Sequence, residues 1–186
     1  MMLKTFRVAM VAALMGSAAL ATPPAGERLV HTNPSPFVVG FHAANADQSI
    51  EEWVPSGENV DRWTRMLTYQ RFTNLVARGE DAPAFARRMQ GLLRGACAGV
   101  QLDAITTGTE NGTHVAQFGS RCPRNPQTGL PETTFFKMID GASDLHVAQV
   151  AFRHAATADE VRWAHAQLAS VVLCGPRSAA AACQTH

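Results

Sequence analysis

The chain has 186 residues, of which 46% are hydrophobic, and this fraction is typical of a folded globular protein. Its formal net charge is only +1, and it contains no basic block. These features exclude the positive surface expected of a protein that binds nucleic acid or an anionic membrane. The length suits one domain with its own core.

Residues 1–21 have the pattern of a secretory signal peptide. Lys4 and Arg7 precede an apolar run at 8–20, and Ala19-Leu20-Ala21 is a cleavage site of the A-x-A type. The run is short for a bilayer span, and no comparable run follows it. We therefore expect cleavage after Ala21, a periplasmic or secreted mature protein, and no transmembrane segment once the signal is removed.

The four cysteines all lie downstream of the predicted signal. An even number of cysteines in an exported protein predicts disulfides, and four cysteines allow three connectivities. Nearest neighbours in sequence favour Cys97–Cys122 and Cys174–Cys183, the second of which would hold the C-terminal tail. A metal site is the alternative, but no C-x-x-C or C-x-x-H spacing is present.

The first predicted strands surround a segment at 48–72 that is rich in aromatic residues. Residues 22–36 are rich in Pro, Ser, Thr and Asn and predict a loose leader, and 37–43 alternate as a strand. Strands at 48–55 and 63–72 then flank a Pro-Ser-Gly turn, although 60–67 also fits a short helix. Trp53, Trp63 and Tyr69 are predicted core anchors.

Two helices are predicted, near 82–97 and 157–173. Asp81 and Pro83 begin the first, and its apolar residues recur at helical spacing. Thr157 and Glu160 form a capping box at the start of the second. Its predicted buried stripe consists of Val161, Ala164, His165, Leu168, Val171 and Val172.

Four further strands are predicted at 100–107, 113–120, 132–140 and 144–154. Asn111-Gly112 and Asp140-Gly141 suit tight turns between them. The pattern predicts a single α+β domain over 37–186, with an antiparallel sheet of about six to seven strands packed by the two helices.

Histidines are the only candidate constellation for chemistry. His146 and His154 lie on one face of a predicted strand, but eight residues of strand span roughly 26 Å, too far for one metal ion. His165 on the last helix could approach either, and His114 could join them. Hydrogen-bonded core histidines are the plainer interpretation. No nucleophile elbow, HExxH or phosphate-binding glycine loop occurs, so no catalytic residue, metal or cofactor is assigned.

Two motifs carry a resemblance to a known fold. The chain contains E-x-V-P-x-G-E and W-T-x-M-x-T-x-Q, formed by Glu52, Val54, Pro55, Gly57, Glu58, Trp63, Thr64, Met66, Thr68 and Gln70. These motifs and the order of elements resemble small exported bacterial proteins of unassigned function with a Mog1/PsbP-like α/β/α sandwich. The resemblance implies a non-enzymatic binding or assembly role and supplies no catalytic residues.

Two hypotheses of function follow. The first is an exported, non-catalytic binding or accessory protein of the cell envelope, whose partner is an unknown envelope protein or small ligand. The alternative is a small metal-assisted enzyme that uses His114, His146, His154 and His165. The export signal and the cysteines favour the first.

Overall fold

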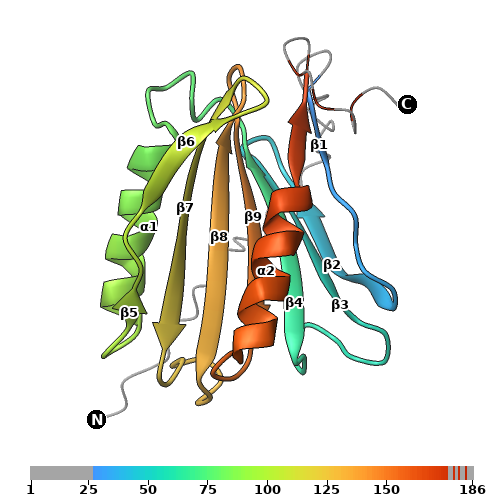
Figure 1. Ribbon diagram of the computed structural model, residues 1–186, viewed down its shortest axis with the longest axis vertical. Coiled ribbons are helices and arrows are strands. Elements are labelled where there is room, and N and C mark those ends of the chain that lie inside the picture. The colour runs from blue at the N-terminus through green and yellow to red at the C-terminus, as the bar shows by residue number, and fades with distance from the viewer. Residues whose placement is uncertain (1–26, 176–177, 179, 181–182, 184–186) are drawn as a thin grey trace.

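The computed structural model describes residues 27–175 together with residues 178, 180 and 183, so the predicted signal at 1–21 lies outside the described residues. Eight strands form one antiparallel sheet (Figure 1). Seven of them lie in the order β2 (Phe37–Ala44), β3 (Gln48–Pro55), β4 (Arg65–Phe72), β9 (Leu145–Phe152), β8 (Glu132–Asp140), β7 (Thr113–Cys122) and β5 (Gln101–Leu102). The eighth strand, β6 (Thr106–Glu110), pairs with β7.

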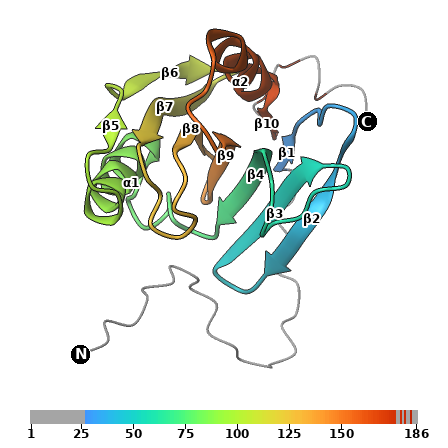
Figure 2. The same ribbon diagram turned by 90° about the horizontal axis from the view of Figure 1, so that it is seen from below.

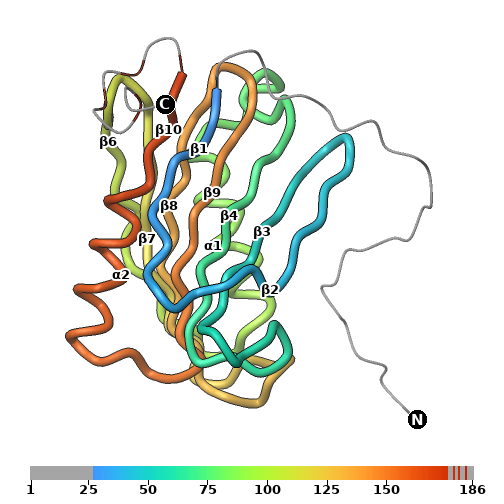
Figure 3. Tube along the Cα trace, turned by 90° about the vertical axis from the view of Figure 1, so that its right-hand side faces the viewer, coloured from blue at the N-terminus to red at the C-terminus, as the bar shows by residue number. Residues whose placement is uncertain are grey.

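A helix packs on each face of this sheet. Figure 2, seen along the strands, shows α1 (Ala82–Ala96) on one side, and α2 (Ala158–Ser170) on the other. On the α2 side lies a second, two-stranded sheet of β1 (Arg28–Val30) and β10 (Val172–Cys174), whose strands run side by side in Figure 3. The predicted α+β class, with helices on an antiparallel sheet, is confirmed. Within the described part of the chain, no helix is long and apolar enough to cross a membrane.

Side chains of the central strands alternate between the two faces of the sheet, so each helix packs on its own hydrophobic core. On β9, Leu145 and Val147 face α1, whereas Val150 and Phe152 face α2. The α1 side also buries Phe85 of the helix against the sheet. The α2 side buries a larger set, namely Leu67, Tyr69, Val115, Phe135, Ile139, Ala148, Val150, Phe152, Ala164, Leu168, Val171 and Leu173.

Both helices begin where the sequence predicted. The Asp81 side chain accepts a hydrogen bond from the Ala84 N–H at 2.8 Å, which satisfies one of the free amides of the first turn. Thr157 and Glu160 form the complete capping box of α2. Cap and apolar spacing agree at both starts, so each start could be located from local sequence alone.

The two disulfides join Cys97 to Cys122 and Cys174 to Cys183, as predicted, with Cα–Cα distances of 6.0 and 5.4 Å. The first ties the end of α1 to the end of β7. The second ties β10 to the segment that follows it.

Three predictions of elements were wrong. Residues 28–30, predicted as loose, form β1 because β10 supplies a strand partner. The segment 100–107 is not one strand: residues 103–105 separate β5 from β6, although the Asp103 N–H still donates to the Gly119 carbonyl of β7. Val172, predicted in the helix, lies in β10. The alternative helix at 60–67 does not form.

The predicted aromatic anchors are buried to different degrees. Tyr69 is buried in the α2-side core, and Trp53 packs against its rim. Trp63 lies just before β4 in a small third cluster, where the Arg153 guanidinium stacks 4.3 Å from its ring centroid. The His31 ring, from the segment after β1, stacks on Tyr69 with centroids 3.7 Å apart. His31 also lies against Trp53, with ring centroids 6.4 Å apart, so the segment at 31–36 covers Trp53 and Tyr69; we call it the strap.

Candidate functional site

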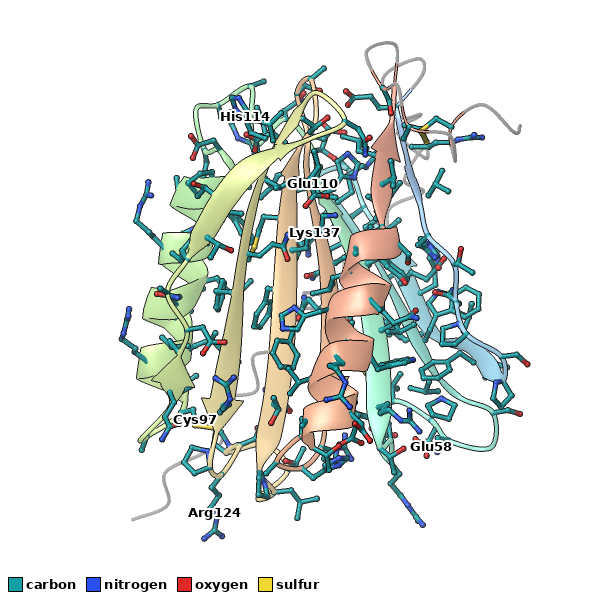
Figure 4. All side chains as sticks on the ribbon, viewed as in Figure 1. Glu58, Cys97, Glu110, His114, Arg124 and Lys137 are labelled. Carbon is teal, nitrogen blue, oxygen red and sulfur yellow. A yellow bond between two sulfur atoms is a disulfide. The ribbon has the colours of Figure 1, made fainter. Side chains whose placement is uncertain are left out.

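The candidate site is a pocket of about 420 Å3 at the end of the sheet where β6 turns into β7 and β8 turns into β9. We call it the end pocket. Figure 4 shows His114 near this end of the molecule. Its lining combines five separate parts of the chain and consists of Glu27, Val76, Gly112, Thr113, His114, Asp140, Gly141, Ala142, Leu173, Gly175 and Ser178.

Two tight turns position the polar residues of the end pocket. Asn111 and Gly112 both have positive φ, 50° and 80°, which is the geometry of the predicted Asn-Gly turn and sets His114 at the start of β7. The β8–β9 turn is closed by a 2.8 Å hydrogen bond from the Gly141 N–H to the Asp144 carbonyl. Glu27 accepts a 2.8 Å hydrogen bond from the Ala142 N–H, so the start of the described chain is fastened to this turn.

Gly141 is required by close packing. A Cβ at this position would lie 2.7 Å from Glu27 Oε2 and 2.8 Å from the Asp144 carbonyl oxygen, both too close for carbon. The same point is 3.4 Å from His146 Nε2. Glu27 Oε2 and His146 Nε2 are both buried without a hydrogen-bond partner. The pocket wall therefore contains one unsatisfied oxygen, on Glu27, and a second unsatisfied atom, on His146, lies close to Gly141 but outside the lining.

Asp140 is the half-buried carboxylate of the pocket. It accepts a 2.7 Å hydrogen bond from the Ala82 N–H at the start of α1, and its other oxygen lies 3.9 Å from His114 Nδ1. Burial raises the pKa of the Asp140 carboxyl, and the nearby charge of Asp81 raises it further. The hydrogen bond from the Ala82 N–H and the charge of His114 partly offset this rise. Asp140 is therefore mainly a structural link between the sheet and α1, with one oxygen facing His114.

His146 lies on the α2 side of β9 and is only 5% exposed. Burial lowers the pKa of its imidazole from 6.5 to about 4; Asp144 opposes that fall and Arg71 adds to it. The ring is therefore neutral at pH 7. His146 is thus buried, as expected of a core histidine, but its Nε2 lacks the hydrogen bond that the sequence analysis expected.

The four candidate histidines do not come together. His114 and His146 lie near the end pocket but on opposite faces of the sheet. Strand pairing puts His146 on the same face as Ile139 and Val115, and His114, one residue before Val115, is on the other face. His154 lies beyond the end of β9 and contacts Glu160 at 3.1 Å, at the far end of the sheet. His165 is exposed rather than buried, with its ring against Phe135. In the part of the chain that the structure describes, no three His, Cys, Asp or Glu side chains could hold one metal ion.

One polar centre was missed by the sequence analysis. Lys137, only 1% exposed, is the one lysine after the predicted signal. Its Nζ donates to the Leu168 and Val171 carbonyls at 3.1 and 3.0 Å and to Glu110 Oε2 at 2.5 Å. Figure 4 shows Lys137 below Glu110. A lysine at an inward position of β8 was the available signal, because a buried lysine needs partners.

Comparison with solved structures places the fold. Cyanobacterial PsbP (CyanoP) from Synechocystis sp. PCC 6803 is similar over 86% of this chain and 98% of that chain, with a TM-score of 0.53 and 13% identity. The Ran-binding protein Mog1p of Saccharomyces cerevisiae gives a TM-score of 0.47 and 12% identity over 84% of this chain and 82% of that chain. The chain therefore has the Mog1/PsbP-like fold that its motifs resembled.

A third similar structure is a Pseudomonas aeruginosa protein of unknown function, with a TM-score of 0.47 and 14% identity over 67% of this chain and 83% of that chain. No protein-family model matches the sequence, and no curated protein matches it. At these identities the likeness concerns the fold alone, and fold does not fix function.

Proposed function

We propose that this chain is an exported, non-catalytic binding or accessory protein of the cell envelope, and that the end pocket is its ligand site. Two disulfides support export, because such bonds persist in oxidising compartments and are rare in the cytosol. The signal pattern at 1–21 supports the same compartment.

The observation that carries the binding role is the construction of the end pocket. Its volume of about 420 Å3 falls within the range of small-molecule sites. Apolar side chains, Val76 and Leu173, lie beside a few polar groups, as is usual in such sites. The Glu27–Ala142 hydrogen bond and the nearby Cys174–Cys183 disulfide hold two of its walls together, so the pocket is formed before any ligand arrives.

The test is native mass spectrometry of the protein purified from a bacterial host that expresses the full chain. We expect a mass that lacks residues 1–21, retains both disulfides and carries a non-covalent adduct. Thr113→Trp would fill the end pocket and remove the adduct. Thr109→Trp, an exposed position of the same hairpin outside the pocket, is the matched control and should retain it.

The outcomes separate the parts of the proposal. A chain retained in the cytoplasm with its residues 1–21 intact would overturn export. An adduct equally present in both tryptophan variants would overturn the end pocket as the site. A stoichiometric metal ion, lost on substitution of His114 or His165 by alanine, would instead support the metal-assisted enzyme.

A further inference from the structure

The fixed charges of the end pocket are of one sign. Two carboxylates, Glu27 and Asp140, line it, and among its described lining residues there is no Lys or Arg. His114 is the one side chain of this lining that can carry a positive charge, and it is exposed to solvent. The pocket therefore favours a ligand of positive charge.

Glu27 is held in place with one carboxylate oxygen unused. Gly141 and Gly175 make room for its side chain, since a Cβ at Gly141 would lie 2.7 Å from Glu27 Oε2 and one at Gly175 would lie 3.0 Å from Glu27 Cγ. Oε1 accepts the hydrogen bond from the Ala142 N–H, whereas Oε2 is buried without a partner. In the part of the chain that the structure describes, Glu27 forms no ion pair.

A carboxylate that is partly withdrawn from water and has no countercharge is costly. The Glu27 charge acts on the pocket even though Oε2 itself is enclosed, because Coulomb interactions extend over several ångströms at low dielectric. A cation bound in the pocket would therefore be stabilised by Glu27 without touching Oε2.

Asp140 supplies the acceptor that such a cation can reach. One of its oxygens accepts from the Ala82 N–H, and the other, Oδ2, lies 3.9 Å from His114 Nδ1, which is too far for a hydrogen bond. Burial and the nearby charge of Asp81 both raise the pKa of the Asp140 carboxyl. A cation at Oδ2 would offset both causes, because it stabilises the ionised form.

The rest of the lining indicates which kind of cation fits. No three His, Cys, Asp or Glu side chains of the described residues could hold one metal ion, and a volume of about 420 Å3 suits an organic ligand. Quaternary ammonium groups are held by aromatic faces, and the described lining has no Phe, Tyr or Trp. It offers hydrogen-bond acceptors instead, on Thr113, Asp140 and Ser178. A primary ammonium group, with three N–H donors, matches such acceptors.

We propose that the ligand of the end pocket is a primary amine, whose ammonium group binds at Asp140 beside the Glu27 wall and whose apolar part lies against Val76 and Leu173. This inference rests on the proposed function, because it names the class of ligand for the same site.

The first test compares four probes that share a hexyl or hexanoyl chain and differ in the head group: hexylamine, hexyltrimethylammonium, hexanoate and 1-hexanol. Each is titrated into the purified chain by isothermal calorimetry near pH 7.5, where an alkylammonium group is charged. We expect hexylamine to bind more tightly than each of the others by a factor of about ten or more. Its binding should be lost in Thr113→Trp and kept in Thr109→Trp.

The second test removes each carboxylate charge. Asp140→Asn keeps an oxygen for the Ala82 N–H, and Glu27→Gln keeps one for the Ala142 N–H. Each should weaken the binding of hexylamine by a factor of about ten or more. The control is Asp47→Asn, which removes the same charge from an exposed position outside the pocket and should leave the dissociation constant unchanged. The thermal midpoint of each variant checks that it folds.

The outcomes separate this inference from the proposed function. Hexanoate or 1-hexanol that binds as tightly as hexylamine, and is lost in Thr113→Trp, would overturn the amine and leave the end pocket as a ligand site. Equal binding of hexyltrimethylammonium would overturn the primary ammonium group, and so would unchanged binding of hexylamine in Asp140→Asn and Glu27→Gln. No binding of hexylamine at millimolar concentration would overturn the inference, whereas the proposed function is decided by the adduct in native mass spectrometry.

Discussion

Strands β2 and β9 have the same length and similar compositions but opposite surroundings. Each has eight residues with a single histidine, FVVGFHAA in β2 and LHVAQVAF in β9. All but one residue of β9 are buried, whereas six residues of β2 are exposed. β9 lies between β4 and β8 and contributes side chains to both cores, and β2 lies at the edge. Place in the sheet, rather than composition, therefore decides burial. Stability should reside in the centre, and the outer strand remains available for contacts.

The largest effect should come from the polar centre beside β9. Lys137→Met keeps the apolar stem of the side chain but leaves the Leu168 and Val171 carbonyls without their buried donor. Removing one partner of a buried charged network costs about 3–5 kcal/mol in the free energy of unfolding. Urea denaturation followed by circular dichroism measures it. Glu110→Gln is the control and should cost less, because Glu110 is 38% exposed. Equal losses would contradict the assignment of the α2 carbonyls as the main partners.

Two matched substitutions, one on each strand, test whether β9 contributes more to stability than β2. Val150→Ala on β9 should lower the free energy of unfolding by about 2–3 kcal/mol, since Val150 is fully enclosed and a cavity remains. Val39→Ala on β2 should change it by no more than about 0.5 kcal/mol, because its side chain is already half exposed. Denaturation at low protein concentration gives both values. Similar losses would mean that β2 is buried in solution even in the monomer.

The pH dependence of stability should report on His146. Its pKa in the folded state, about 4, lies below the ordinary value of 6.5, so the unfolded chain binds the extra proton first. Stability is therefore complete above pH 6.5 and falls as the pH drops towards 4. Between pH 7 and pH 5 the expected loss is about 2 kcal/mol. Thermal melts across this range measure the slope, and His146→Gln should flatten it. An unchanged slope in that variant would assign the effect to other groups.

A smaller loss than that from His146 should come from breaking a contact of the strap. The Tyr69 hydroxyl donates a 2.9 Å hydrogen bond to Asn33 Oδ1, so Tyr69→Phe should cost about 1 kcal/mol. Burial raises the pKa of the Tyr69 phenol, and Glu51 raises it further. Because Tyr69 is the only tyrosine, tyrosinate absorbance reports on this site alone. In the folded chain the tyrosinate absorbance should rise only well above pH 10, whereas in the chain unfolded in urea it should rise near pH 10. Coincident curves would show that the strap does not cover Tyr69.

The sequence was most informative where the signals were local. Capping residues located both helix starts, and Asn111-Gly112 located a hairpin turn, because each depends on a few neighbouring atoms. The disulfide pairing followed from the shortest separations. Alternation predicted strands but not their order, so it could not distinguish the edge strand β2 from the central strand β9.

The failures have a common cause in long-range partners. Arg28–Val30 becomes a strand only through β10, and His165 is exposed because α2 packs on the sheet through Ala164 and Leu168. The end pocket combines Glu27 with turns more than eighty residues away, and nothing near Glu27 in the sequence indicates that role. The four histidines could be offered only as candidates, because the sequence does not show how the strands that carry His114 and His146 are ordered or which faces these two residues share.

The pairing of β1 with β10 sets the order in which this domain can be completed. Of the strands that the structure describes, β1 is the first to leave the ribosome or a translocation channel and its partner β10 is the last. Until β10 arrives, Leu29 and the strap residue His31 have no adjoining strand to hold them over the sheet. Folding is therefore completed in a late step, when β10 pairs with β1. In a nascent chain stalled before Val172, the aromatic side chains of β3 and β4 would remain uncovered.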